Sequence, residues 1–131
     1  MSGTQSIIGR SVPRLEDEVL LKGEGRFAAD ISFPNQLHMR VVRASNAHAR
    51  IVSIDTAAAR AATGVVAVWT SNDIQDVPPI DFRDPAAEAL GPYRQPVLAH
   101  KIIRYVGEPV AVVFAEDPYL AEDAADFVEI D

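Results

Sequence analysis

The chain has 131 residues, the length of a single domain, and 48% of them are hydrophobic, which is enough for a core of its own. It contains no cysteine, which excludes disulfides, thiolate zinc sites and any iron–sulfur cluster held by this chain alone. The formal net charge is −7 without a basic stripe, and no apolar run reaches the roughly 18 residues of a membrane span, so we expect neither nucleic acid nor a membrane as partner. A chain without cysteine or a secretory signal fits a reducing cytosol, and we expect a cytoplasmic location.

The N-terminal residues are predicted to form an arm. Residues 1–13 are polar and end in Val12-Pro13, which indicates an extended segment. Residues 14–21 could form a helical turn that the glycines of segment 22–25 end. Residues 26–31 look like a short strand. We therefore expect an arm over 1–13 and one domain over 14–131.

The next segments read as strands around a short helix. After a turn at 33–36, residues 37–43 alternate between apolar and polar side chains, which is typical of a half-buried strand. Residues 50–54 predict a second strand. An alanine-rich helix then begins at Asp55 or Thr56 and runs to Thr63, and residues 65–69 form another apolar strand.

Residues 75–96 differ from the rest because they hold five of the nine prolines of the chain. The composition predicts a long irregular loop with one turn of helix at Pro85 to Leu90. Loops of this length in a compact domain are usually functional. Phe82, Arg83, Tyr93 and Arg94 could contact a ligand or a partner there.

A bent pair of strands follows the loop. Residues 103–106 form a short apolar run, and 110–115 form a longer one that predicts a strand buried on both faces. Between them, Gly107 allows backbone conformations that other residues avoid, and Pro109 fits only the start of a strand. Such a corner lets one segment serve two sheets.

The last predicted elements are a helix and a strand. Asp117 is a good N-cap and Pro118 suits the first helical position, so a helix is expected over 117–126. A final strand begins at Phe127, and the sequence stops inside it, so we expect the domain to be incomplete at its C-terminal end. The order lacks the regular alternation of a doubly wound sheet. We predict an α+β fold, a mixed sheet with two short helices and a long proline-rich loop.

No group of residues predicts a self-contained catalytic site. His38, His48 and His100 are not at metal-ligand spacing. Ser45, His48 and Asp55 have the residue types of a triad, but a triad is recognised by geometry. Glu108, beside a glycine corner, is the best single candidate for acid–base chemistry. Alternatively, it accepts hydrogen bonds from loop amides or pairs with Arg104. We therefore assign no catalytic, cofactor-binding or metal-ligating residue.

The order of motifs resembles a known family. The strongest motif is Arg104-Tyr105-Val106-Gly107-Glu108-Pro109-Val110-Ala111-Val112-Val113, followed in register by residues 119–125. Earlier matching segments are 12–17, 22–31, 37–43, 47–51, 54–55, 64–68 and 97–99. Together they resemble the N-terminal α/β-hammerhead domain of the aldehyde oxidase, xanthine dehydrogenase and carbon monoxide dehydrogenase large-subunit family.

The resemblance implies that other parts of the enzyme bind the cofactors and perform the reaction. In that family the hammerhead domain precedes a larger molybdopterin-binding region with the catalytic glutamate, while iron–sulfur clusters and flavin (FAD) lie in other domains or subunits. We expect this chain to be a structural or docking module of a molybdenum hydroxylase. It would carry none of these cofactors, be inactive alone, and have a molybdopterin-binding domain or subunit and an iron–sulfur subunit as partners. The isolated domain could also form a homo-oligomer through an exposed edge strand.

Two alternatives remain open at this point. The chain could be a stand-alone protein-interaction module, or a small enzyme that uses Glu108 in a pocket beside the proline-rich loop.

Overall fold

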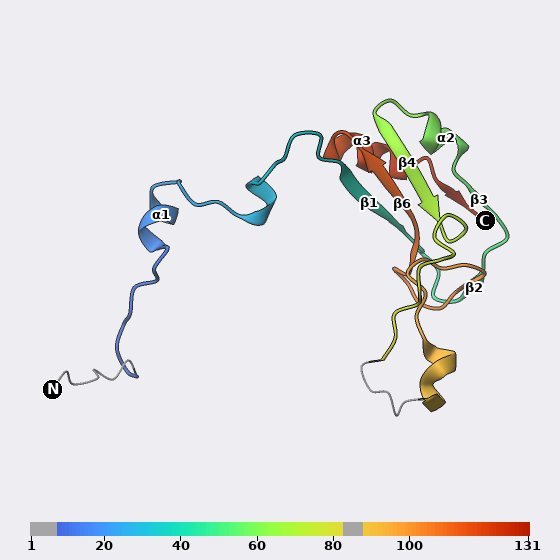
Figure 1. Cartoon of the computed structure of the whole chain (residues 1–131), viewed down its shortest axis with the longest axis horizontal. Helices are drawn as coiled ribbons and strands as arrows, with labels where there is room; N and C mark the ends of the chain where they lie inside the picture. Colours follow the sequence, from blue (N-terminus) through green and yellow to red (C-terminus); the bar gives the residue numbers. More distant parts are fainter. Residues whose placement is uncertain (1–7, 83–87) are drawn as a thin grey trace. The chain divides into compact units, whose positions relative to one another are not determined.

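A computed structural model describes residues 8–82 and 88–131 in two compact units, residues 1–34 and residues 35–131. The first unit contains helix α1 (Asp17–Leu21) and the 3₁₀ helix η1 (Ala28–Asp30) (Figure 1). Neither helix has a buried side chain. None of the helices in the described residues is long and apolar enough to cross a bilayer.

The second unit is built around a three-stranded sheet in the order β1-β6-β4. Its strands are β1 (His38–Arg43), β4 (Val65–Thr70) and β6 (Pro109–Ala115), and both pairings are antiparallel. The apolar run that predicted a doubly buried strand is β6, and it occupies the centre. Pro109 stands at its first residue, where the missing amide costs no central ladder bond.

Two short antiparallel ladders lie beside the sheet. Strand β2 (Ala49–Arg50) pairs with β5 (Ile102–Ile103), and β3 (Ile54–Asp55) pairs with β7 (Glu129–Ile130). The chain passes from β5 into β6, and therefore from one sheet into another, at Gly107, whose φ is +86°. The predicted corner between two sheets is confirmed.

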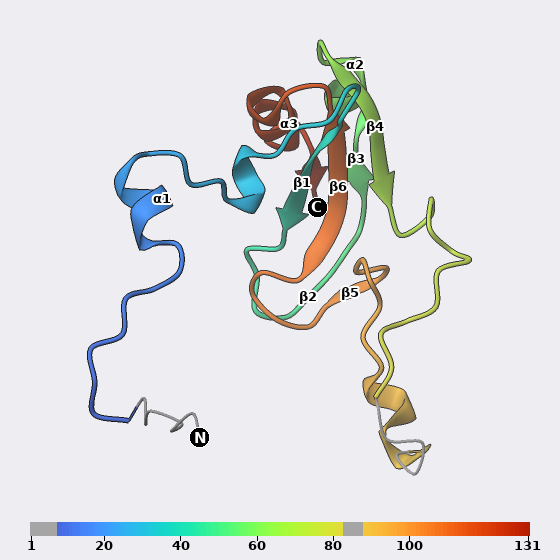
Figure 2. The same cartoon turned by 60° about the vertical axis from the view of Figure 1, so that its left-hand side comes forward.

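Two helices cover one face of the sheet (Figure 2). They are α2 (Ala57–Ala61) and α3 (Pro118–Ala125), and they contribute Ala59 and Ala124 to a core that includes Val68, Ala111 and Val113. The carboxylate of Asp117 accepts the amide hydrogens of Tyr119 at 2.8 Å and Leu120 at 3.4 Å, as the sequence predicts. The α+β class is confirmed.

Two predicted strands are wrong. Residues 26–31 contain η1 instead, because the carboxylate of Asp30 accepts the amide of Phe27 at 2.9 Å and closes a tight turn. Residues 50–54 do not form one strand. They divide between β2 and β3, because Ile51 donates its amide to Lys101 while Val52 donates to Asp131, so the two ends follow different partners.

The described residues of the proline-rich loop contain regular structure. Ile80 and Gln95 form an isolated antiparallel bridge, and the 3₁₀ helix η2 (Glu88–Tyr93) lies between them in sequence. The predicted helical turn at Pro85 to Leu90 overlaps η2, although its first residues and Arg83 lie outside the described residues.

Candidate functional site

The corner at Glu108 is the first candidate site. The Glu108 side chain is 0% exposed. Its Oε2 accepts the backbone amide of Arg104 at 2.5 Å, and its Oε1 lies 3.0 Å from Nη1 of the same residue. Both carboxylate oxygens are therefore occupied by one neighbour, which is the structural alternative that the sequence left open.

Backbone hydrogen bonds fix this corner to the segment after β1. Ala44 donates to the carbonyl of Glu108 at 2.9 Å, and Gly107 donates to the carbonyl of Ala44 at 2.8 Å. Nη1 of Arg43 donates to the carbonyl of Gly107 at 2.8 Å. A carboxylate that is enclosed and fully bonded has no open side for a substrate, so the geometry gives Glu108 a structural role.

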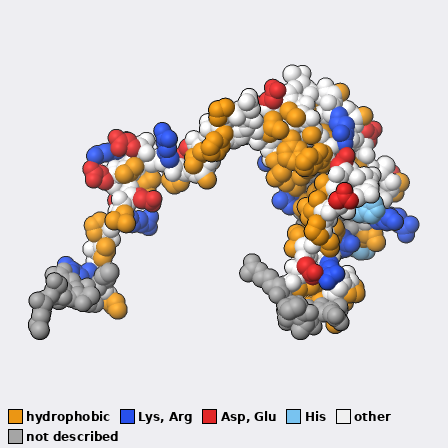
Figure 3. All heavy atoms as spheres, in the orientation of Figure 1, with side chains coloured by type: hydrophobic (Ala, Val, Ile, Leu, Met, Phe, Trp, Pro, Cys, Tyr) orange, Lys and Arg blue, Asp and Glu red, His pale blue; other side chains and the backbone are white. Residues whose placement is uncertain are grey.

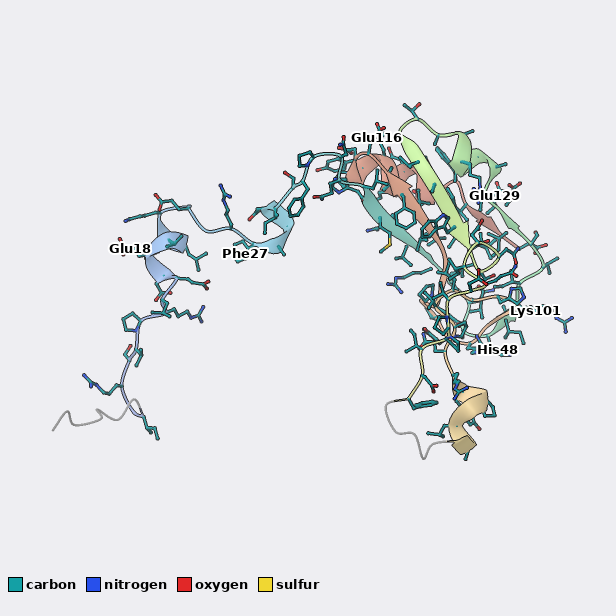
Figure 4. The ribbon with its side chains drawn as sticks, in the orientation of Figure 1. Glu18, Phe27, His48, Lys101, Glu116 and Glu129 are labelled. Atoms are coloured by element: carbon teal, nitrogen blue, oxygen red, sulfur yellow. The ribbon has the colours of Figure 1, made fainter. Side chains whose placement is uncertain are left out.

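The other predicted candidates do not converge. Asp55 uses its carboxylate to accept the amide of Ala57 at the start of α2, and the hydroxyl of Ser45 bonds to Asn46. Figure 4 labels His48 at one end of the domain and Glu116, which lies between β6 and α3, at the other. Within the described residues, no three His, Asp or Glu side chains are grouped to hold a metal ion.

A cleft of about 360 Å³ lies between the turn after β4 and the segment before β5. Its walls are mainly apolar, with Ile74, Val77 and Leu98 among them. Ser71 and His100 supply polar groups, and Ser71 Oγ lies 3.1 Å from His100 Nδ1. Among the described residues, no carboxylate completes this pair into a relay.

Two carboxylates near the cleft are held in their ionised form. The pKa of Asp73 is lowered, chiefly because Thr70 donates its backbone amide at 2.7 Å, and also by the Thr70 hydroxyl and by Arg60. The pKa of Asp81 is lowered, first by the amide of Phe82 and then by Arg94, whose Nε lies 2.9 Å away. These carboxylates stabilise a turn and the base of the proline-rich loop.

Some of the loop residues predicted to contact a ligand or a partner are bonded within the chain, and others are exposed. Phe82 and Tyr93 are exposed, whereas Arg94 pairs with Asp81. The side-chain amide of Gln95 donates to the hydroxyl of Tyr105, which ties the loop to the corner.

One face of the central sheet is left uncovered by the described residues of the second unit, 35–82 and 88–131, and sequence reasoning missed this feature. On the face opposite α2 and α3, the strands present six apolar side chains, Met39, Val41, Ala67, Trp69, Val112 and Phe114. The sequence held one signal for this face. Residues 65–69 and 110–115 are apolar at almost every position, so neither face of a sheet built from them is polar.

Comparisons with known proteins define the class of this fold. The model of the family described as "Aldehyde oxidase and xanthine dehydrogenase, a/b hammerhead domain" matches residues 22–131. Quinoline 2-oxidoreductase from Pseudomonas putida 86 superposes with a TM-score of 0.77 and 39% identity over 94% of this chain. Reconstituted CO dehydrogenase from Oligotropha carboxidovorans gives a TM-score of 0.79 and 37% identity, also over 94% of the chain. The fold is an α/β-hammerhead.

Similar curated sequences point the same way. The nicotine 6-hydroxylase large subunit of Paenarthrobacter nicotinovorans is 44% identical over 98% of this chain, and the carbon monoxide dehydrogenase large chain of Afipia carboxidovorans is 39% identical over 90%. The chain belongs to the aldehyde oxidase and xanthine dehydrogenase hammerhead-domain family. It spans only 16% and 14% of the lengths of these two relatives.

Proposed function

We propose that this chain is the structural docking module of a molybdenum hydroxylase and is inactive alone. The observation that carries the proposal is the match over nearly the whole chain to proteins of which it spans about one sixth. A hammerhead domain of this size would serve a larger polypeptide that performs the chemistry. We also propose a cytoplasmic location. The division into an arm, 1–13, and a domain, 14–131, is a prediction from the sequence alone.

The donor groups of the chain support placing the cofactors elsewhere. Without cysteine it has no thiolate for an iron–sulfur cluster, and among the described residues no acidic or histidine group converges on a metal position. The chain therefore offers no thiolate ligand for an iron–sulfur cluster. We propose that molybdopterin, iron–sulfur clusters and, where used, FAD are held by partner domains or subunits.

A complementation experiment tests the proposal. The large subunit of nicotine 6-hydroxylase from Paenarthrobacter nicotinovorans would be produced without its matching 128 residues, together with the tagged full chain supplied separately. We expect the shortened subunit to co-purify with the chain and to contain molybdenum, measured by mass spectrometry of the metal. Stoichiometric molybdenum on the full chain alone, or no retention of the subunit, would contradict the proposal.

A further inference from the structure

Six apolar side chains from all three strands share the uncovered sheet face, and Arg43 follows them at the end of β1, beyond a register shift. In the register of the sheet, Met39 is opposite Phe114, and Val112 lies between Val41 and Trp69. Figure 3 shows hydrophobic side chains gathered over β1, β6 and β4 on this side. None of the six residues defined above carries a charge or a hydroxyl.

This composition is unusual for a face in contact with water. An antiparallel sheet that packs helices on one side normally alternates apolar with polar residues and leaves its other face polar. Here Met39 is 58% exposed and Trp69 is 45% exposed. The ring of Trp69 meets Phe114 edge to face with centroids 4.7 Å apart, so the largest side chains form one raised cluster.

Within residues 35–82 and 88–131, the helices α2 and α3 pack on the opposite face. A patch rich in Trp, Phe and Met without charged residues has the character of a permanent interface and not of a transient one. A second copy of this chain is a poor occupant, because each copy carries a net charge of −7 and the two would repel.

We propose that this face docks onto the molybdopterin-bearing part of the large subunit to which the domain belongs. The relatives are long enough to contain such a partner, because more than four fifths of each relative lies outside the segment that matches this chain. The inference rests on the proposed function and adds the surface through which it acts. Trp69 is the main anchor of the proposal, because large aromatic side chains carry most of the energy of such interfaces.

The complementation experiment locates the surface when variants of the full chain are compared. Trp69→Glu and Met39→Glu each place a charge in the patch, one on each outer strand of the sheet. We expect each to weaken retention of the shortened subunit about tenfold or more. Tyr119→Glu is the matched control, because Tyr119 is 76% exposed on α3, and we expect it to change retention less than about twofold.

The outcomes separate the two proposals. Failure of the unmodified chain to retain the subunit overturns both. Retention by the unmodified chain and equally by Trp69→Glu and Met39→Glu overturns the assigned face alone. Met39 is more exposed than buried, so we expect Met39→Glu to keep the fold. A loss of retention in this variant is then not caused by unfolding, and circular dichroism of the variant checks this. A dimer of the isolated chain that dissociates in both variants would show a second copy on the face and overturn the proposal.

Discussion

At the scale of single residues, the Glu108–Arg104 pair is the interaction with the largest expected effect on stability. We expect Glu108→Ala to lower the free energy of unfolding of the full chain by about 2–4 kcal/mol, because it empties a buried volume and leaves the Arg104 amide unpaired. Glu108→Gln keeps an oxygen for that amide and should cost less. Urea denaturation followed by circular dichroism measures both.

The matched control for this prediction is a second arginine–carboxylate pair. Arg94 and Asp81 are joined at a similar distance, 2.9 Å, but both side chains are about half exposed. We expect Arg94→Ala to change the unfolding free energy much less than Glu108→Ala, because water screens an exposed pair. An effect of Arg94→Ala as large as that of Glu108→Ala would show that burial does not explain the role of Glu108.

Asp73 should make the stability of the chain depend on pH. Its pKa in the folded chain lies below the ordinary value of 3.8, so its charge stabilises the fold above that value, and the contribution is lost as the pH falls through the lowered pKa. We therefore expect the unfolding free energies of the parent chain and Asp73→Asn to differ most near neutral pH and to converge below pH 3.8. Urea denaturation across this range tests it. A difference that grew on acidification would contradict the assigned hydrogen bonds.

At the scale of elements, the sequence predicted an element correctly where nearby residues supply its caps and hydrogen bonds or where its apolar pattern is unbroken. Helix α3 follows from Asp117 and Pro118, whose roles depend on neighbours within three residues. Strand β6 follows from its unbroken apolar run. The predicted strand at 26–31 failed because a strand needs a partner, and Asp30 instead closes a turn with Phe27.

The contact between Gly64 and α3 tests how tightly the elements pack. Gly64 has a φ of +75°, and a Cβ there would lie 2.5 Å from Leu120 Cδ1. We expect Gly64→Ala to cost about 2–3 kcal/mol, from the unfavourable φ and the contact with α3 together.

Gly107→Ala is the control that separates these two causes. Gly107 has a φ of +86° but no atom within 4 Å of the added Cβ, so only the backbone cost of about 1–2 kcal/mol applies. Thermal or urea unfolding of both variants gives the comparison. Equal losses would show that Leu120 moves away without cost and that α3 is loosely packed.

At the scale of the whole molecule, the candidate site could be predicted only in part. The pairing of Glu108 with Arg104 was one alternative to acid–base chemistry that the sequence left open, and the burial and contacts of Glu108 decided between them. The apolar sheet face could not be located, because which side chains share a face depends on the register between β1, β4 and β6, which lie far apart in sequence. Family membership could be predicted from the sequence alone, because it depends on the order of motifs along the chain and not on contacts between distant residues.

The distribution of buried residues predicts where proteases act on the isolated full chain. Every buried hydrophobic side chain among the described residues lies between Ala44 and Val128, and α1 and η1 bury none. We expect limited trypsin digestion to cut after Arg14, Lys22 and Arg26 and to leave a stable fragment that begins at Phe27, because an accessible backbone without a core opens easily. Mass spectrometry identifies the fragment. A stable fragment beginning at Leu15 would instead support a domain that starts at residue 14, and protection of these sites in the complementation complex would show that the partner covers the segment.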